Sequence, residues 1–319
     1  MSRVFSAARA RMPAPQLRAR AARAVLASQM RMQAVLDGET VQRRALAITG
    51  RRWVPIDYAT SSRRAIGSAA GQDIVSEPLR RLIDARRAEV ISTLSELTAV
   101  AGGLRRVQQL PESPGDPFWA NGWFGGLDAA ALYGFLRIRA PRTYVEIGSG
   151  HSTVFAARAV RDAGLATRIV SIDPQPRADI SALCHEAVRT PLELADLERF
   201  DALEAGDMVL MDGSHRVFTG SDAVVFFLRL LPRLAPGVLV GVDDVHLPLD
   251  YPSYLADRYW SEQYLLAAWL LAGDRLETVL PGAWVVHDRA YAPAVDALWR
   301  AAGMEVVPRE ATAFWFLTR

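Results

Sequence analysis

Short apolar runs alternate with helical runs through the later two-thirds of the chain. The clearest runs, at 168–172, 208–211 and 238–242, are apolar without alternation, as expected for strands covered by helices on both faces. Weaker strands are predicted at 144–147, 188–192, 277–280 together with 284–287, and 313–317. Helical spacing predicts helices at 128–138, 152–163, 180–186, 197–205, 222–234, 262–272 and 293–302. This alternation predicts an α/β fold with a doubly wound, mostly parallel, seven-stranded sheet.

The first third of the chain has a different pattern. Residues 15–48 and 76–110 have helical spacing, and residues 49–75 between them contain Gly, Ser, Pro and paired arginines that predict a loop. A stretch rich in Gly and Pro at 102–118 resembles a linker. We therefore expect a helical N-terminal segment over 1–114 and the main domain over 115–319.

Composition and charge limit the classes of protein. The longest apolar runs, 223–228 and 264–272, are shorter than the roughly 20 residues of a membrane span, so we expect no transmembrane span and a cytoplasmic location. Residues 1–110 carry a balance of +11 and the remainder −9, and every basic residue is arginine, which is typical of a GC-rich bacterium. The basic segment leaves open a membrane-surface contact or a homo-oligomer, although solvated helix faces are the simpler interpretation. We expect no nucleic-acid partner. A lone cysteine, Cys184, excludes an internal disulfide.

The stretch 144–153 has the order strand, glycine turn, helix. Glu146 lies inside the apolar run, and Gly148, Ser149 and Gly150 follow it. This order is typical of sites where a nucleotide-like ligand meets the open end of a parallel strand. A dinucleotide fingerprint has a third glycine where this chain has Thr153, which argues against a pyrophosphate. Ser152 and Thr153 can cap the following helix.

Acidic residues follow the ends of the strongest predicted strands. Asp173, Asp212 and the pair Asp243–Asp244 come directly after the runs at 168–172, 208–211 and 238–242. The carboxyl ends of parallel strands meet at one edge of a sheet, so these acids are expected to line one crevice. Asp173 is placed to accept hydrogen bonds from a ribose diol; the alternative is a turn cap before Pro174.

The motifs VEIGSGHST, SIDPQP, DMVLMDGSHRVFTGSD and GVDDVHLPLDYP, in this order, resemble the class I S-adenosylmethionine-dependent methyltransferases, and in particular a bacterial subgroup with EIGSGHST and DGSH motifs. RYWSEQYLL, over 258–266, is also similar to a segment of that subgroup. The resemblance covers about residues 117–319 and implies a Rossmann-like sheet. It also implies S-adenosylmethionine as cofactor, held by these residues: Glu146, Gly148, Ser149, Gly150, His151, Ser152, Thr153, Asp173 and Asp212.

The resemblance also implies catalytic and metal-binding candidates. In metal-dependent O-methyltransferases of this class, acids after the fourth and fifth strands hold Mg²⁺, and Asp212, Asp243 and Asp244 occupy those places here. This chain departs from the expected His-Asp or Asp-Asn pair at 243–244, so a pair of loop-capping acids stays an alternative. A neutral histidine suits the removal of an acceptor proton. His215 and His246 are the candidates, with Asp212 beside the reacting centre.

The acceptor side has weaker signals. Asn121, Trp123, Tyr251 and Glu262 could line a site for a small-molecule acceptor, since aromatic walls with a few polar groups suit sugars or natural-product-like rings. We expect methyl transfer, at oxygen, to such an acceptor. Two alternatives stay open: a non-catalytic cofactor-binding or interaction module of the same fold, and an NAD-type oxidoreductase, which Thr153 disfavours.

Overall fold

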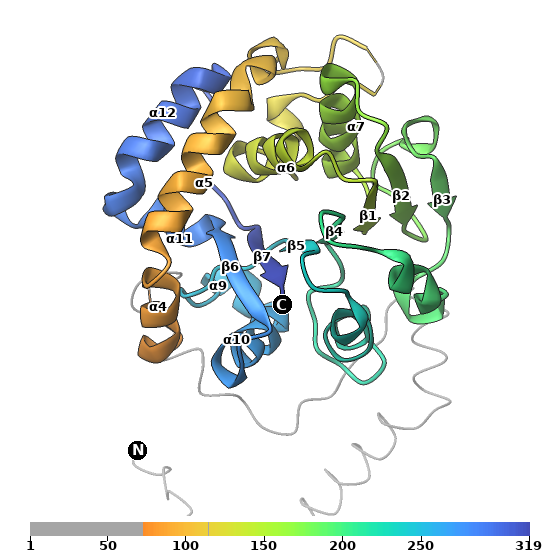
Figure 1. Ribbon diagram of the computed structural model, residues 1–319, viewed down its shortest axis with the longest axis vertical. Helices are drawn as coiled ribbons and strands as arrows, with labels where there is room; N and C mark the ends of the chain where they lie inside the picture. Colours follow the sequence, from red (N-terminus) through yellow and green to blue (C-terminus); the bar gives the residue numbers. More distant parts are fainter. Residues whose placement is uncertain (1–72, 114) are drawn as a thin grey trace, which may run out of the picture. The chain divides into compact units, whose positions relative to one another are not determined.

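The computed structural model describes residues 73–113 and 115–319. The helix predicted at 15–48 and most of the loop predicted at 49–75 lie outside the described residues. Seven strands form one sheet in the order β3-β2-β1-β4-β5-β7-β6 (Figure 1). Their bounds are β1 Thr143–Ile147, β2 Arg168–Ile172, β3 Glu186–Val188, β4 Met208–Met211, β5 Leu239–Val242, β6 Leu276–Pro281 and β7 Phe314–Thr318.

The sheet is mostly parallel, as predicted. Strands β1 to β5 pair in parallel, whereas β7 lies antiparallel between β5 and β6. All residues of β4 and β5 are buried, which explains why their sequences are apolar without alternation. The fold is therefore the Rossmann-like, doubly wound α/β arrangement that the alternation predicted.

Helices cover both faces of the sheet (Figure 1). Helix α6 packs against α7 and α5, and α5 packs against α12. Both α7 and α12 end at a glycine in the left-handed conformation, Gly164 and Gly303, which is a common way to stop a helix. The helices are α4 Glu77–Asp84, α5 Arg87–Val100, α6 Gly126–Arg139, α7 His151–Ala163, α8 Asp222–Val225, α9 Ser253–Ala256, α10 Glu262–Ala272, α11 Gly282–His287 and α12 Ala292–Ala302.

Helices α4 and α5 belong to the same hydrophobic core as the sheet. Leu79, Ile83, Val90, Leu94 and Leu97 are at most 1% exposed and join that core. Trp284 Nε1 of α11 donates to Asp84 of α4 at 2.9 Å, which adds a polar contact between distant parts of the sequence. The division at residue 114 stays a prediction, since most of the segment 1–114 lies outside the described residues.

Several predicted elements differ in the structure. Trp284–His287 was predicted as a strand but belongs to helix α11. The segment 180–186 was predicted as a helix, yet it contains a single 3-10 turn at Ser181–Leu183, and β3 begins at Glu186 rather than at 188. The segment 197–205 is a 3-10 helix over Leu197–Ala202. The long helix predicted at 222–234 is a short α-helix continued by a π-helical and a 3-10 turn.

No helix within 73–113 or 115–319 is both long and apolar enough to cross a membrane.

Candidate cofactor and catalytic site

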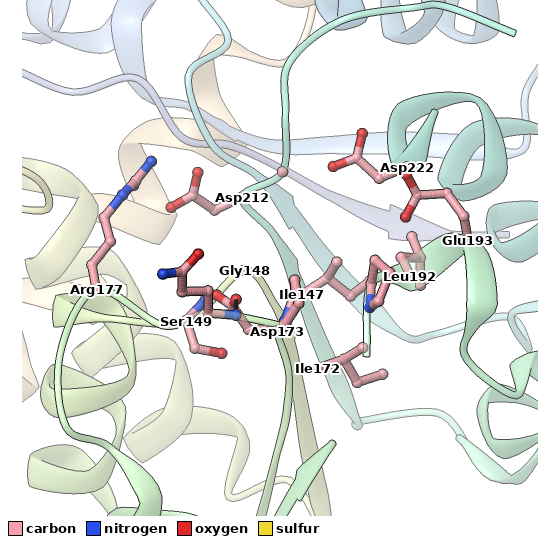
Figure 2. A pocket seen from close by; sticks show the side chains of 14 residues that line it. Ile147, Gly148, Ser149, Ile172, Asp173, Arg177, Leu192, Glu193, Asp212 and Asp222 are labelled. Carbon is pink, nitrogen blue, oxygen red and sulfur yellow. Dashed lines mark hydrogen bonds between the residues drawn. The ribbon is translucent and has the colours of Figure 1, made fainter. Parts of the chain in front are cut away.

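A cavity of about 260 Å³ opens at the carboxyl ends of β1, β2 and β4 (Figure 2). This is the edge at which the acids were expected to gather. The cavity has an apolar part and a polar part. Its lining residues are Ile147, Gly148, Ser149, Ile172, Asp173, Pro174, Gln175, Arg177, Pro191, Leu192, Glu193, Asp212, Gly213 and Asp222.

The glycine turn after β1 needs glycine at position 148. Gly148 has φ +79°, which side chains rarely tolerate, and a Cβ atom there would lie 1.7 Å from the backbone oxygen of Asp212. The backbone of β4 also closes on this turn, since Asp212 N donates to Ile147 O at 2.8 Å. The absence of a side chain therefore brings the end of β4, with its acid, directly against the turn after β1.

Asp173 lies at the end of β2 with its carboxylate beside the turn. Its Oδ2 atom accepts from Ser149 N at 2.6 Å and its Oδ1 atom accepts from Gln175 N at 2.6 Å. A carboxylate has about four acceptor positions, so two remain for hydroxyl groups of a ligand. Asp173 is thus both a turn cap, the alternative considered above, and an acceptor on the wall of the cavity.

Glu146 is fully buried and does not line the cavity. Its Oε1 atom accepts from Tyr144 at 3.0 Å, and Oε2 accepts a short hydrogen bond from Thr153, whose Oγ1 in turn accepts from Gly150 N at 3.1 Å. Burial raises the pKa of Glu146 to about 7, although hydrogen bonds from Ser152, Thr153 and Tyr144 oppose the rise. Glu146 thus supports the turn from behind, a different position from the ligand contact that was predicted.

Four other cofactor candidates also lie outside the cavity wall. Gly150, Ser152 and Thr153 belong to the turn and the first residues of α7, and Ser152 and Thr153 are buried. His151 packs edge-on against Phe118, with ring centroids 5.2 Å apart. Of the turn itself, only Gly148 and Ser149 line the cavity.

Beyond β4 and β5, the structure brings together Asp212, His215 and Asp244. His215 Nε2 lies 3.5 Å from Asp212 Oδ1 and 3.3 Å from Asp244 Oδ2, and one atom from each residue lies within 4.8 Å of the others. His215 and Asp244 have φ of +63° and +56°, and such strained backbone is typical of functional sites. We call these three residues the strand-end cluster.

The His215 ring is held from its other side by Glu262. Nδ1 of His215 lies 2.5 Å from Glu262 Oε1, and the Glu262 side chain is completely buried. Burial alone would lower the pKa of His215, but the carboxylates of Glu262, Asp244 and Asp212 outweigh it and raise this pKa to about 9. The side chain is therefore an imidazolium at neutral pH in the protein alone.

The neighbouring carboxyls share this electrostatic environment. Burial raises the pKa of Asp212 to about 6 and that of Glu262 to about 7, against the opposing charge of His215. Burial also raises the pKa of Asp244, while His215 and Arg177 oppose the rise. Perturbed titratable groups that gather beside a cavity are typical of catalytic sites.

Asp243 points away from the strand-end cluster, unlike its neighbour Asp244. It is 4% exposed and accepts from Thr312 Oγ1 at 3.2 Å; Thr312 N in turn donates to Asp128 Oδ2 at 2.8 Å. Burial and the adjacent charge of Asp244 raise the pKa of Asp243 well above its usual value. Of the three acids predicted as metal ligands, Asp212 and Asp244 lie close together beside His215, whereas Asp243 lies apart from them.

The other catalytic and acceptor candidates are more dispersed. His246 packs edge-on against Tyr251 at 5.8 Å, and burial lowers its pKa to about 4. Tyr251 is fully buried, so it offers no surface to an acceptor. Asn121 uses its amide to bind the backbone of its own turn at Phe118, Trp123 and Phe124, so no hydrogen-bonding capacity remains for a substrate. We therefore no longer expect Tyr251 and Asn121 to bind the acceptor.

Trp123 and Arg177 form an exposed pair at the edge of the cavity. Trp123 is 64% exposed, and the Arg177 guanidinium carbon lies 4.5 Å above its ring. Arg177 lines the cavity and extends toward Asp212 (Figure 2). Arg177 was not among the predicted site residues, although it follows SIDPQP directly.

The cavity fits the nucleoside part of a cofactor such as S-adenosylmethionine. Ile172 and Leu192 supply an apolar surface next to the Asp173 carboxylate, which can accept from a ribose diol, and Gly148 leaves room for close approach to the backbone. Arg177 and Asp212 supply opposite charges at the far edge. The hydrogen-bonding groups and the apolar surface of the cavity therefore fit S-adenosylmethionine, the cofactor that the sequence implied.

A family described as a methyltransferase domain matches residues 145–245. The matched range covers less than half of the chain, but it begins in β1 and ends just after Asp244, so it contains the glycine turn and the strand-end cluster. This part of the chain is thus similar to methyltransferase domains. No curated protein matches the chain in sequence.

Solved structures of methyltransferases are similar in arrangement. An O-methyltransferase from Bacillus cereus in complex with SAH is 17% identical, covers 72% of this chain and 91% of its own, and has a TM-score of 0.33. The SAH-bound methyltransferase PaMTH1 from Podospora anserina is 15% identical, covers 84% and 99%, and has a TM-score of 0.33. Similarity at these identities and TM-scores does not identify an activity or a substrate.

Proposed function

We propose that the protein is an S-adenosylmethionine-dependent methyltransferase that acts on a small molecule at a hydroxyl oxygen. One observation carries this proposal: the cavity with Gly148 and Asp173 adjoins the strand-end cluster, and Asp212 belongs to both. A nucleoside-binding wall and a proton-accepting group are thus neighbours. The family match over residues 145–245 supports methyl transfer, without bearing on the acceptor.

The cofactor supplies a methyl group already activated on a sulfonium. Asp173 accepts from the ribose hydroxyls, and Gly148 and Ser149 let the backbone approach the ligand. His215 Nε2 would take the proton of the acceptor hydroxyl as that oxygen receives the methyl group from the cofactor sulfur. Holding both reactants in line would supply much of the rate enhancement.

His215 must be neutral before it can accept this proton. In the protein alone its pKa is about 9, because three carboxylates surround the ring. A cation that enters the cavity beside Asp212 opposes the imidazolium and lowers that pKa. The positive charge of the bound cofactor therefore favours the form of His215 that can act as a base.

Binding measurements separate this proposal from its alternatives. Isothermal titration calorimetry with S-adenosylmethionine, S-adenosylhomocysteine and NAD is expected to show binding of the first two and none of NAD. Binding of NAD alone would contradict the proposal and favour an oxidoreductase. A non-catalytic module would bind the cofactor, but the wild type would methylate none of the acceptors in a screen of sugars, catechols and polyketide-like compounds. For an enzyme, the wild type would methylate one of them, and His215→Ala and Asp212→Ala would lower that activity.

We also propose that Asp212 and Asp244 hold a divalent cation such as Mg²⁺. Carboxylate oxygens suit Mg²⁺, and one carboxylate oxygen of each acid lies within 4.8 Å of the other. EDTA is expected to lower activity at least tenfold, and added Mg²⁺ to restore it. Mg²⁺ should also raise the melting temperature of the wild type but not that of Asp244→Asn. Full activity in EDTA would exclude the cation.

A further inference from the structure

The residues before and at the start of α10 contact His215 on several sides. Ser261 N and Glu262 N donate to His215 O at 2.8 and 3.3 Å, and the Trp260 ring lies 4.1 Å from the imidazole ring. Glu262 Oε1 lies 2.5 Å from Nδ1. Ser261 Oγ also accepts from Val217 N at 2.9 Å, two residues beyond His215. We call residues 260–262 the His215 clamp; they lie within RYWSEQYLL, the one motif to which the proposed function gives no role.

Glu262 is placed as a partner of His215 rather than as an acceptor ligand. Its side chain is 0% exposed, and its Oε1 atom bonds to His215. Its Oε2 atom is buried and has no hydrogen-bond partner within the described residues. A buried carboxylate is costly unless a charged or hydrogen-bonding partner compensates for it. In the described part of the chain, His215 is that partner.

The contact between Glu262 and His215 decides which ring nitrogen is free to accept a proton. Above its pKa of about 7, Glu262 is an ionised carboxylate that can only accept, so Nδ1 carries the hydrogen and donates it to Glu262. Nε2 then faces Asp212 and Asp244, at 3.5 and 3.3 Å, on the side where the cavity opens. The positive φ of His215, held by the two backbone hydrogen bonds from the clamp, sets the direction of the ring.

We propose that Glu262 is the positioning residue of the site: its carboxylate fixes the His215 ring with Nδ1–H toward itself, so that Nε2 is the nitrogen presented to the acceptor. The chemical part of this inference rests on the proposed function. The acceptor O–H bond would break and its proton would bond to Nε2. The oxygen electron pair would bond to the methyl carbon while the methyl–sulfur bond breaks, and the sulfur would keep that electron pair and leave as S-adenosylhomocysteine. The carboxylate of Glu262 stays ionised and stabilises the imidazolium that results, as a carboxylate does in other histidine-based sites.

The first test needs no acceptor. Protein labelled with ¹⁵N-histidine shows which ring nitrogen of His215 carries the hydrogen, once the ring is neutral at high pH, and His215→Asn identifies its signals. The wild type is expected to show Nδ1–H, and Glu262→Ala to show a shift toward Nε2–H. Nε2–H in the wild type, or Nδ1–H unchanged in Glu262→Ala, would overturn the proposal.

Two further variants keep this test decisive. Glu262→Gln preserves the buried volume if Glu262→Ala does not fold, and its amide can donate as well as accept, so it should also lose the single tautomer. Glu277→Ala is the matched control, because Glu277 is a partly buried glutamate of β6 that pairs with Arg86 and Arg319. It is expected to leave the His215 signals unchanged.

The second test uses turnover, with an acceptor found by the screen described above. Glu262→Ala is expected to lower kcat on the order of 10²-fold, with little change in the KM for S-adenosylmethionine. If Glu262 acts through His215, adding Glu262→Ala to His215→Ala should change kcat less than twofold. Losses that multiply would show that Glu262 acts elsewhere.

The two tests fail for different reasons. A protein that does not bind S-adenosylmethionine refutes the proposed function, but leaves the tautomer of His215 to be decided by the spectra. A protein that binds the cofactor and shows the Nε2–H tautomer refutes the role of Glu262 alone.

Discussion

Single residues on the cavity wall combine structural and binding tasks. Asp173 accepts hydrogen bonds from Ser149 N and Gln175 N, so it shapes the two loops that form the wall, and it still has acceptor positions facing the cavity. Gly148 acts in the opposite way, because the absence of a side chain allows the ends of β1 and β4 to touch. Cofactor affinity should therefore be sensitive to both positions.

Asp173→Ala is expected to weaken S-adenosylmethionine binding about 10- to 100-fold, since hydrogen bonds to a charged group are worth about 1.5–3 kcal/mol. Calorimetry measures this directly. Asp179→Ala is the control, because Asp179 is an exposed acid on the same connection that does not line the cavity. Equal affinities for Asp173→Ala and the wild type would remove Asp173 from the site.

The positions of the acids that follow the strands were predictable from the sequence only in part. Their gathering at one edge was predictable from topology, since parallel strands end together. Which of two adjacent acids faces the crevice was not predictable, because neighbouring side chains at a strand end point in opposite directions. Asp244 turns to His215, and Asp243 turns to Thr312. The contact between Glu262 and His215 was not predictable for another reason: the two residues are 47 positions apart.

At the scale of elements, the site is built by loops that rigid neighbours hold in place. The loop after β5 is pinned by the segment before α4: Val75 N donates to Pro248 O and Asp250 N donates to Asp73 O. Gln263 of α10 binds the backbone of the same loop at His246 N. The residues before α4 therefore fix the loop that carries Asp244, whereas α10 acts on that loop through Gln263 and directly on His215 through Glu262.

Helix α5 gives a prediction about this architecture. Leu94 is fully buried in the common core, so Leu94→Ala should lower the free energy of unfolding by about 2–5 kcal/mol. Chemical denaturation followed by circular dichroism measures the loss, and the transition of residues 73–319 should remain a single step. Ser95→Ala, at the exposed neighbouring position, should cost far less. A Leu94→Ala variant as stable as the wild type would indicate that α5 does not contribute to this core.

The elements that were wrongly predicted share a physical cause. Trp284–His287 is a short apolar run, and periodicity alone cannot separate a buried strand from a buried turn of helix. The segments at 180–186 and 197–205 contain apolar residues at helical spacing, such as Ile180 and Phe200, but fold as 3-10 turns that only anchor a loop. Helices α6, α7, α10 and α12 were predictable because their patterns extend over several turns, and the central strands because they are unbroken apolar runs; the helix predicted at 222–234 is the exception.

At the scale of the whole molecule, buried ionisable groups dominate the dependence of stability on pH. Burial raises the pKa of Glu146 and Glu262 to about 7 and that of Asp212 to about 6, while neighbouring carboxylates raise that of His215 to about 9. Each group binds its proton more tightly in the folded state than in the unfolded state. Their contribution to stability therefore falls as pH rises, whereas His246, whose pKa is lowered to about 4, contributes in the opposite direction between about pH 4 and 6.5.

The pH range over which stability is lost follows from these pKa values. The carboxyl contributions are present below about pH 4.5 and are lost as pH rises to 7, and the His215 contribution is lost between about 6.5 and 9. The melting temperature, measured in EDTA without cofactor, should fall from pH 5 to pH 9. Glu146→Gln removes one titrating group, whose pKa shift corresponds to a change in stability on the order of 3 kcal/mol. The melting temperature of this variant should fall less steeply than that of the wild type between pH 5 and 7, and equally above pH 7. A melting temperature that rises over this range would contradict the assignment.

The order of the strands in the sheet has a consequence for synthesis. Strand β7 lies between β5 and β6, yet it leaves the ribosome last of the seven. Until it emerges, the edge of β5, with its run Leu239–Val242, has no partner on that side, at an elongation rate of about 5–20 residues per second. An open apolar edge pairs readily with other chains. The nascent chain therefore depends, for several seconds, on whatever in the cell shields that edge from its neighbours.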